Sequence, residues 1–70
     1  MPIFLAPLNT DIRVIKILTD EKTKKHLESL GITIHLSLRV LSSNNGGVVV
    51  AVKEGRLALD KNISSKIFVA

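Results

Sequence analysis

The chain has 70 residues, of which 46% are apolar, and it contains no cysteine. This length predicts one small domain over residues 1–70, which buries only about 60% of the surface that its unfolded form exposes. The lack of cysteine excludes disulfides and thiolate metal sites, and it is compatible with a cytoplasmic protein. Ten Lys and Arg residues against six Asp and Glu give a formal net charge of +4, which predicts a solvated basic surface.

Four further classes are disfavoured by the sequence. No apolar run reaches the roughly 20 residues that a membrane-spanning helix needs, and residues 1–7 are too short and lack the basic residues of a secretory leader. Phe4 and Phe68 are the only aromatic residues, so the chain lacks the stacking surfaces that single-stranded nucleic acids use and the aromatic grooves that hold proline-rich peptides. We therefore expect no nucleic acid partner, and a partner contact made by aliphatic side chains or a β-edge with charges at the rim.

The first predicted strand follows an apolar lead-in. Residues 2–9 contain both prolines and end at the turn-type cluster 9–11. Residues 12–18 are rich in β-branched side chains, which favour a strand. Its alternation places Ile12, Val14 and Leu18 on one face and Ile15 and Ile17 on the other. We therefore expect both faces of this strand to be covered near its end.

An amphipathic helix is predicted next. Thr19 or Asp20 is the expected N-cap, because short polar side chains accept hydrogen bonds from the first amides of a helix. Thr23, Leu27 and Leu30 are spaced by four and three residues and therefore share one face. This face is expected to pack on the core.

The helix is expected to end at Gly31. Glycine adopts the left-handed conformation that commonly terminates helices without a Cβ penalty, and Ile32 can then fold back onto Leu27. Beyond this stop, the pattern changes to the two-residue repeat of a half-buried strand, with apolar Ile34, Leu36, Leu38 and Val40.

The remaining chain predicts a meander of short strands. Residues 42–47 read Ser-Ser-Asn-Asn-Gly-Gly and predict a turn, because Asn-Gly is a strong hairpin signal. The other elements follow in order: strand 48–52, a tight reversal at 53–56, strand 57–59, one helical or 3₁₀ turn capped by Asp60, and a closing strand at 66–69.

This order of elements predicts a mainly β fold. Five short strands in so few residues leave exposed edges unless the sheet curls. A small SH3-like five-stranded barrel, partly open, with one α-helix inserted between the first two strands fits best. An open α+β sheet is the alternative.

Candidate chemical groups are few. The chain has no phosphate-binding loop, and Asp20-Glu21 is better explained as a helix start than as an acid/base pair, so we expect no enzyme and no catalytic residues. His26 and His35 are weak candidates for metal ligands, but they stand nine residues apart on different elements, and no sequence rule brings them together. We expect no cofactor, with weak transition-metal binding as the alternative.

Several segments together resemble the ferrous iron transport protein A (FeoA) family. They are Pro2–Ile17, the L-x-x-L-G-I segment Leu27–Ile32, Gly46–Val50, the R-L-A-L-D segment Arg56–Asp60, and Ile63–Val69. The resemblance covers nearly the whole chain and rests on the order and spacing of these segments. The family usually has glycine at positions 9 and 35, and Asn9 and His35 enter left-handed conformations more readily than most residues. Both turns should therefore persist, with His35 in a turn and the next strand starting near Leu36.

The resemblance implies a small cytosolic accessory protein of ferrous iron uptake. Such a protein is an interaction module for a membrane iron transporter that bears a cytosolic GTPase domain, and the same kind of domain also occurs fused behind iron-dependent repressors. The residues leave two alternatives, a transition-metal-binding regulatory module and a basic nucleic-acid-binding barrel. We expect the docking surface on the exposed helix face, at Lys24, Lys25 and Glu28, and on the turn at Asn44 to Gly47, with Asn44 and Asn45 as its candidate residues.

Overall fold

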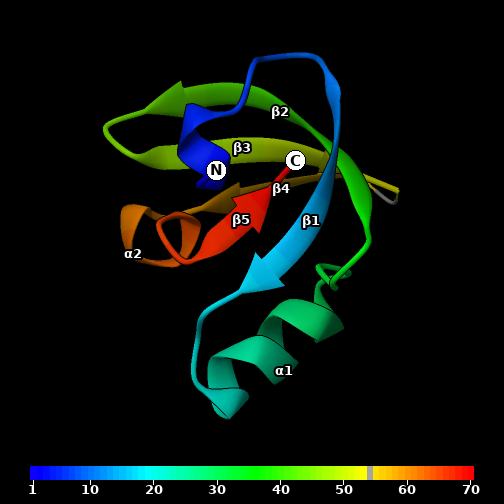
Figure 1. Cartoon of the computed structure of the whole chain (residues 1–70), viewed down its shortest axis with the longest axis vertical. Coiled ribbons are helices and arrows are strands. Elements are labelled where there is room, and N and C mark those ends of the chain that lie inside the picture. Colours follow the sequence, from blue (N-terminus) through cyan, green and yellow to red (C-terminus); the bar gives the residue numbers. More distant parts are fainter. Residues whose placement is uncertain (54) are drawn as a thin grey trace.

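The computed structural model describes residues 1–53 and 55–70. Its elements are a 3₁₀ helix η1 (Ile3–Leu5), strand β1 (Asp11–Ile17), helix α1 (Glu21–Ser29), strands β2 (Ser37–Asn44), β3 (Gly47–Val52) and β4 (Gly55–Leu59), helix α2 (Lys61–Ser64) and strand β5 (Ile67–Val69). The predicted insertion of the helix between the first two strands is confirmed. Figure 1 shows α1 at one end of the molecule, beyond the sheet.

The five strands form one curled, antiparallel sheet. Their order is β4-β3-β2-β1-β5, and within the described residues β4 and β5 do not pair with each other. The lead-in extends the sheet, since Pro2 bridges to Phe68 and Leu8 bridges to Val40. The mainly β prediction is confirmed, while the word barrel describes the curl of the sheet and not its closure.

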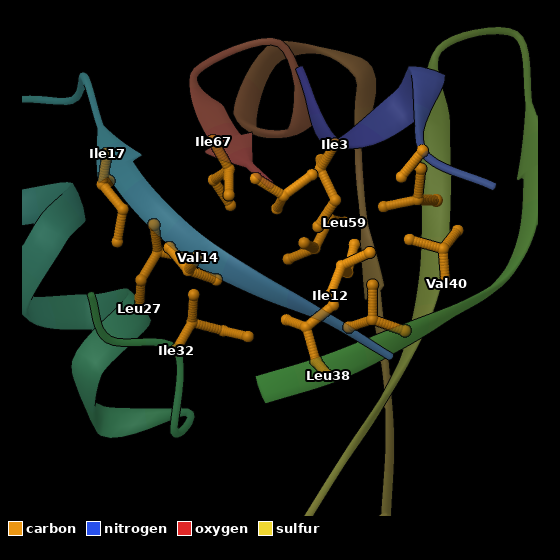
Figure 2. Packing of buried hydrophobic residues seen from close by; sticks show 14 residues of the cluster. Ile3, Ile12, Val14, Ile17, Leu27, Ile32, Leu38, Val40, Leu59 and Ile67 are labelled. Carbon is orange, nitrogen blue, oxygen red and sulfur yellow. The ribbon is translucent and has the colours of Figure 1, made fainter. Parts of the chain in front are cut away.

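The core is aliphatic and lies inside the curl of the sheet, as Figure 2 shows. Its buried apolar members are Ile3, Ala6, Ile12, Val14, Ile17, Leu27, Ile32, Leu38, Val40, Val48, Val50, Leu59, Ile67 and Val69. The sequence did not predict η1, yet its Ile3 is fully buried. The lead-in is therefore part of the core.

The expected faces of β1 were wrong beyond Val14. Ile17 is buried, whereas Ile15 and Leu18 are 47% and 52% exposed. The pairing of β1 with β5 shifts its register between Val14 and Lys16. Such a bulge adds one residue to a strand and reverses the inward and outward alternation beyond it. The two faces are therefore not both covered at the end of β1.

Helix α1 begins and ends largely as predicted. The Asp20 carboxylate accepts a hydrogen bond from the Thr23 amide at 3.0 Å. At the other end Gly31 has φ +93°, and the Ile32 amide donates to the Leu27 carbonyl at 2.9 Å. With the Gly31 amide donating to Glu28 at 3.0 Å, this is a Schellman motif, whose apolar contact joins Leu27 and Ile32.

The strand after the helix starts later than the alternation predicted. Residues 33–36 form a turn, Ile34 is 37% exposed, and β2 begins at Ser37. The turn is held by the His35 amide, which donates to the Val14 carbonyl at 2.7 Å. His35 has φ +76° and Asn9 has φ +58°, which confirms that both residues adopt the left-handed conformation expected of them.

The hairpin between β2 and β3 is tighter than the predicted turn over 42–47. Only Asn45 and Gly46 lie between the paired residues Asn44 and Gly47. Both have positive φ, at +53° and +84°, as a two-residue type I′ turn requires. The reversal predicted at 53–56 includes residue 54, which lies outside the described residues.

Helix α2 fastens this hairpin to the rest of the fold. Asp60 caps it as predicted, and its carboxylate accepts a hydrogen bond from the Ile63 amide at 2.8 Å. The fully buried Ser64 donates its hydroxyl to the Gly46 carbonyl. A buried hydroxyl is costly unless it is hydrogen-bonded, so this contact fixes the hairpin turn against α2.

Candidate docking site at the end of helix α1

A shallow groove lies between the C-terminal end of α1 and the end of β3. It encloses about 330 Å³ and is lined by Glu28, Ser29, Leu30, Gly31, Leu36, Val52 and Lys53. Leu30 is 40% exposed, and Leu36 and Val52 are half-buried. The groove is therefore aliphatic, with one carboxylate and one ammonium group among its lining residues.

The helix stop creates this groove. Leu27 and Ile32 supply the apolar contact of the Schellman motif, so Leu30 is left outside the core as the capping residue. The predicted inward face was therefore right for Leu27 and wrong for Leu30. The signal in the sequence was the position of Leu30 directly before the glycine stop. Leu27 and Ile32, on the two sides of this stop, are the residues that pack in the core.

The predicted docking residues fall in two separate places. Lys24 is half-buried, while Lys25 and Glu28 are exposed on α1, and of these three Glu28 lines the groove. Asn44 and Asn45 are exposed at the β2–β3 hairpin. Figure 1 shows this hairpin far from α1. The sequence did not point to Leu36, Val52 or Lys53 because β3 meets the helix only in the folded chain.

The two histidines lie on different elements. His26 is exposed on α1, and His35 is exposed in the turn before β2. Among residues 1–53 and 55–70, no group of three or more His, Cys, Asp or Glu side chains gathers where a metal could be held. Metal binding by either histidine stays a prediction.

A second, polar hollow lies where the two helices begin. It encloses about 420 Å³ and is lined by Leu18, Thr19, Asp20, Thr23, Asp60, Asn62, Ile63 and Lys66. Asp20 and Asp60 both use a carboxylate oxygen to cap a helix. The Thr19 hydroxyl is buried without a partner among the described residues. The two carboxylates are therefore accounted for by helix capping, as the sequence predicted for Asp20.

The Asp20 cap should make stability depend on acid pH. Hydrogen bonds from Thr23 lower the pKa of Asp20 below its ordinary 3.8, and nearby Lys66 and Lys22 lower it further. A lowered carboxyl pKa in the folded state means that the carboxylate stabilises the fold above its unfolded pKa, and that this contribution is lost as the pH falls through the folded pKa. Asp20→Ala should therefore lower the urea midpoint at pH 7, and the difference from the parent should shrink below about pH 4.

Urea titrations at pH 7, 5 and 3 would measure this difference. Ser65→Ala is a suitable control, because the Ser65 hydroxyl donates to the Asn62 carbonyl and does not titrate in this range. A difference between the parent and Asp20→Ala that is constant from pH 7 to pH 3 would contradict the role of the charged cap.

Comparison with known proteins identifies the family. The family model described as the FeoA domain matches residues 1–70. The chain belongs to the FeoA domain family. This FeoA domain is similar to the crystal structure of an iron uptake regulatory protein (FeoA), with a TM-score of 0.86, 24% identity, and coverage of 99% of this chain and 93% of that chain.

A second solved structure has the same fold within a larger chain. It is ScaR with bound Zn²⁺, with a TM-score of 0.85 and 17% identity over 99% of this FeoA domain and 35% of the ScaR chain. Among curated proteins, the sequence has no significant match. The resemblance of the L-x-x-L-G-I segment and its neighbours to FeoA is thus confirmed.

The family assignment supports a small accessory protein of ferrous iron transport. Within the described residues, no helix has the length and apolar character needed to pass through a bilayer.

Proposed function

We propose that this FeoA domain works in the cytoplasm as an interaction module that docks on the cytosolic, GTPase-bearing part of a membrane ferrous iron transporter and modulates iron uptake. The observation that carries the proposal is the family match over residues 1–70. An accessory protein without a catalytic group acts by binding, so a docking surface is the first requirement of this function.

The groove at the end of α1 supports the proposal. Its lining combines the exposed Leu30 with half-buried Leu36 and Val52, and burial of apolar surface is the main favourable term in protein association. Glu28 and Lys53 in the lining offer one charge of each sign to a partner. Such a lining would allow a contact through aliphatic side chains with charges at the rim.

Calorimetric titration of the purified FeoA domain into the cytosolic region of the transporter tests the proposal, with and without guanine nucleotide. We expect saturable heat, and slower ferrous iron uptake in cells in which the gene is deleted. Absence of heat under both conditions, together with unchanged iron uptake in the deletion strain, would refute the proposed function.

Leu30→Asp should weaken this docking about tenfold or more, because it places a carboxylate in an apolar contact; tenfold corresponds to about 1.4 kcal/mol. Leu5→Asp is the matched control, since Leu5 is 62% exposed and lies in η1, outside the groove lining. Both variants should keep a urea midpoint close to that of the parent. Equal weakening by the two substitutions would show that the groove is not the docking site.

A further inference from the structure

All three arginines of the chain lie on the outer face of the sheet. Arg13, Arg39 and Arg56 are exposed residues of β1, β2 and β4. Six of the seven lysines lie elsewhere, on the two helices, in the reversal after β3 or before β5, and only Lys16 is in a strand. The two kinds of basic residue are thus sorted by position, although either would keep a surface soluble.

The strand register places these arginines close together. Arg39 lies opposite Asp11 on β1 and opposite Ala51 on β3, and Ala51 lies opposite Arg56 on β4. Arg13 is two residues from Asp11 on the same face, so it is a diagonal neighbour of Arg39, at about 7–8 Å. Arg56 is two strands from Arg39, about 9.5 Å at the usual strand spacing. We call Arg13, Arg39, Arg56 and Asp11 the arginine face.

The charge of the arginine face is only partly balanced. The Arg39 guanidinium contacts the Asp11 carboxylate at 2.6 Å, and this pairing lowers the pKa of Asp11 and raises that of Arg39. Across residues 1–53 and 55–70, this is the one ion pair of the molecule. The small residue Ala51 lies between Arg39 and Arg56 on this face, so a partner can approach the guanidinium groups.

The chemistry of the face suits a partner that carries carboxylates. Arginine presents a planar fork of donors that matches a carboxylate in a bidentate manner, which lysine does not. The same fork also matches phosphate, so the spacing of the arginines, and not their charge, selects the partner. The row of residues also contains no aromatic side chain on which a base could stack.

We infer that the arginine face binds a carboxylate-rich segment of a partner protein. This goes beyond the docking proposed above, because the surface lies on the outer side of the sheet and not in the groove at α1, and because the partner is defined by its acidic side chains. In an extended segment, alternate residues point the same way at about 6.6–6.8 Å, close to the separation of Arg13 and Arg39. Alternating glutamates would therefore suit the face.

The direct probe is an alternating glutamate–serine peptide, titrated into the isotopically labelled protein at low ionic strength and followed by amide chemical shifts. We expect shift changes centred on Arg13, Arg39 and Arg56, and binding that weakens as salt is added. A short DNA duplex and phosphatidylserine vesicles are titrated in parallel. Tighter binding of the duplex or the vesicles at this face would overturn the assignment to an acidic protein segment.

Matched variants distinguish binding at the arginine face from a general effect of the net charge of the protein. Arg13→Gln with Arg56→Gln should weaken peptide binding about 2- to 25-fold, at about 1.5- to 5-fold for each exposed charge contact. Lys22→Gln with Lys61→Gln removes the same charge from the two helices. This control should change the affinity for the peptide only as much as the lower net charge of the protein does. Equal losses in the two double variants would overturn the inference.

Asp11→Asn gives the sharpest test because it predicts a gain. It releases Arg39 from its ion pair and should tighten peptide binding about 1.5- to 5-fold. Glu21→Gln makes the same change in net charge at the start of α1 and should have a smaller effect. If Asp11→Asn leaves affinity unchanged, or if Glu21→Gln raises it as much, the arginine face is not the binding surface.

Discussion

Replacing Leu27 by alanine is expected to lower the free energy of unfolding by about 2–5 kcal/mol, as for other buried leucines. Leu27 is the fully buried residue of α1, and Figure 2 shows it beside Ile32 and facing Val14 and Ile17. Its loss therefore leaves a cavity between the helix and the sheet. Domains are stable by only about 5–15 kcal/mol. The Leu27→Ala variant should therefore be largely unfolded at moderate urea concentrations.

The matched control is Leu30→Ala, which removes the same atoms three residues later. Leu30 is 40% exposed, so its truncation should change the free energy of unfolding by about 0.5 kcal/mol or less. Urea unfolding followed by far-ultraviolet circular dichroism measures both variants. Similar losses in the two would mean that Leu30 packs on the core as the helical spacing predicted, and would contradict the groove.

Gly31→Val should lower the free energy of unfolding by about 1–3 kcal/mol, because it strains the backbone. Gly31 has φ +93°, and a Cβ atom built there meets no atom within 4 Å. The penalty therefore comes from the conformation itself, which a β-branched residue adopts poorly, and not from a clash. The Ile32 amide, which donates to Leu27 at 2.9 Å, should exchange its hydrogen faster as the Schellman motif weakens.

Gly31→Asn is the matched control, because it also adds a side chain at this position. Asparagine tolerates positive φ better than valine does, so it should cause less backbone strain. We expect the asparagine variant to lose clearly less stability than the valine variant, with urea midpoints and hydrogen exchange at Ile32 as the measurements. Equal losses for valine and asparagine would contradict an origin in backbone conformation.

The features that the sequence predicted well are local. Asp20 and Asp60 accept hydrogen bonds within their own helices, Gly31 ends α1, and Asn45-Gly46 forms the hairpin turn. Each depends on the intrinsic preference of one or two residues, which neighbours in space alter little. The family resemblance rested on the order and spacing of short segments along the chain, and the match of the FeoA domain to residues 1–70 confirms it.

The candidate site was predicted less well than the fold. Glu28 lies in the groove as part of the expected helix face, but Leu30 was assigned to the core and Val52 was read only as part of a strand. The groove forms where the end of β3 meets the end of α1. No local pattern encodes such a meeting between segments about 20 residues apart, because it depends on how the sheet curls.

The sequence alone therefore determined the order of α1, the five strands and α2, the helix caps and the hairpin turn, and the family to which the chain belongs, because capping and turn preferences act over a few residues. The tertiary structure decided which side chains face inward. The bulge after Val14 turned Ile17 into the core and left Leu18 exposed. The Leu27–Ile32 contact kept Leu30 outside, and strand register gathered the three arginines on one face. Pairing between distant segments sets the bulge and the grouping of the arginines, and it is fixed only when the sheet assembles around its core.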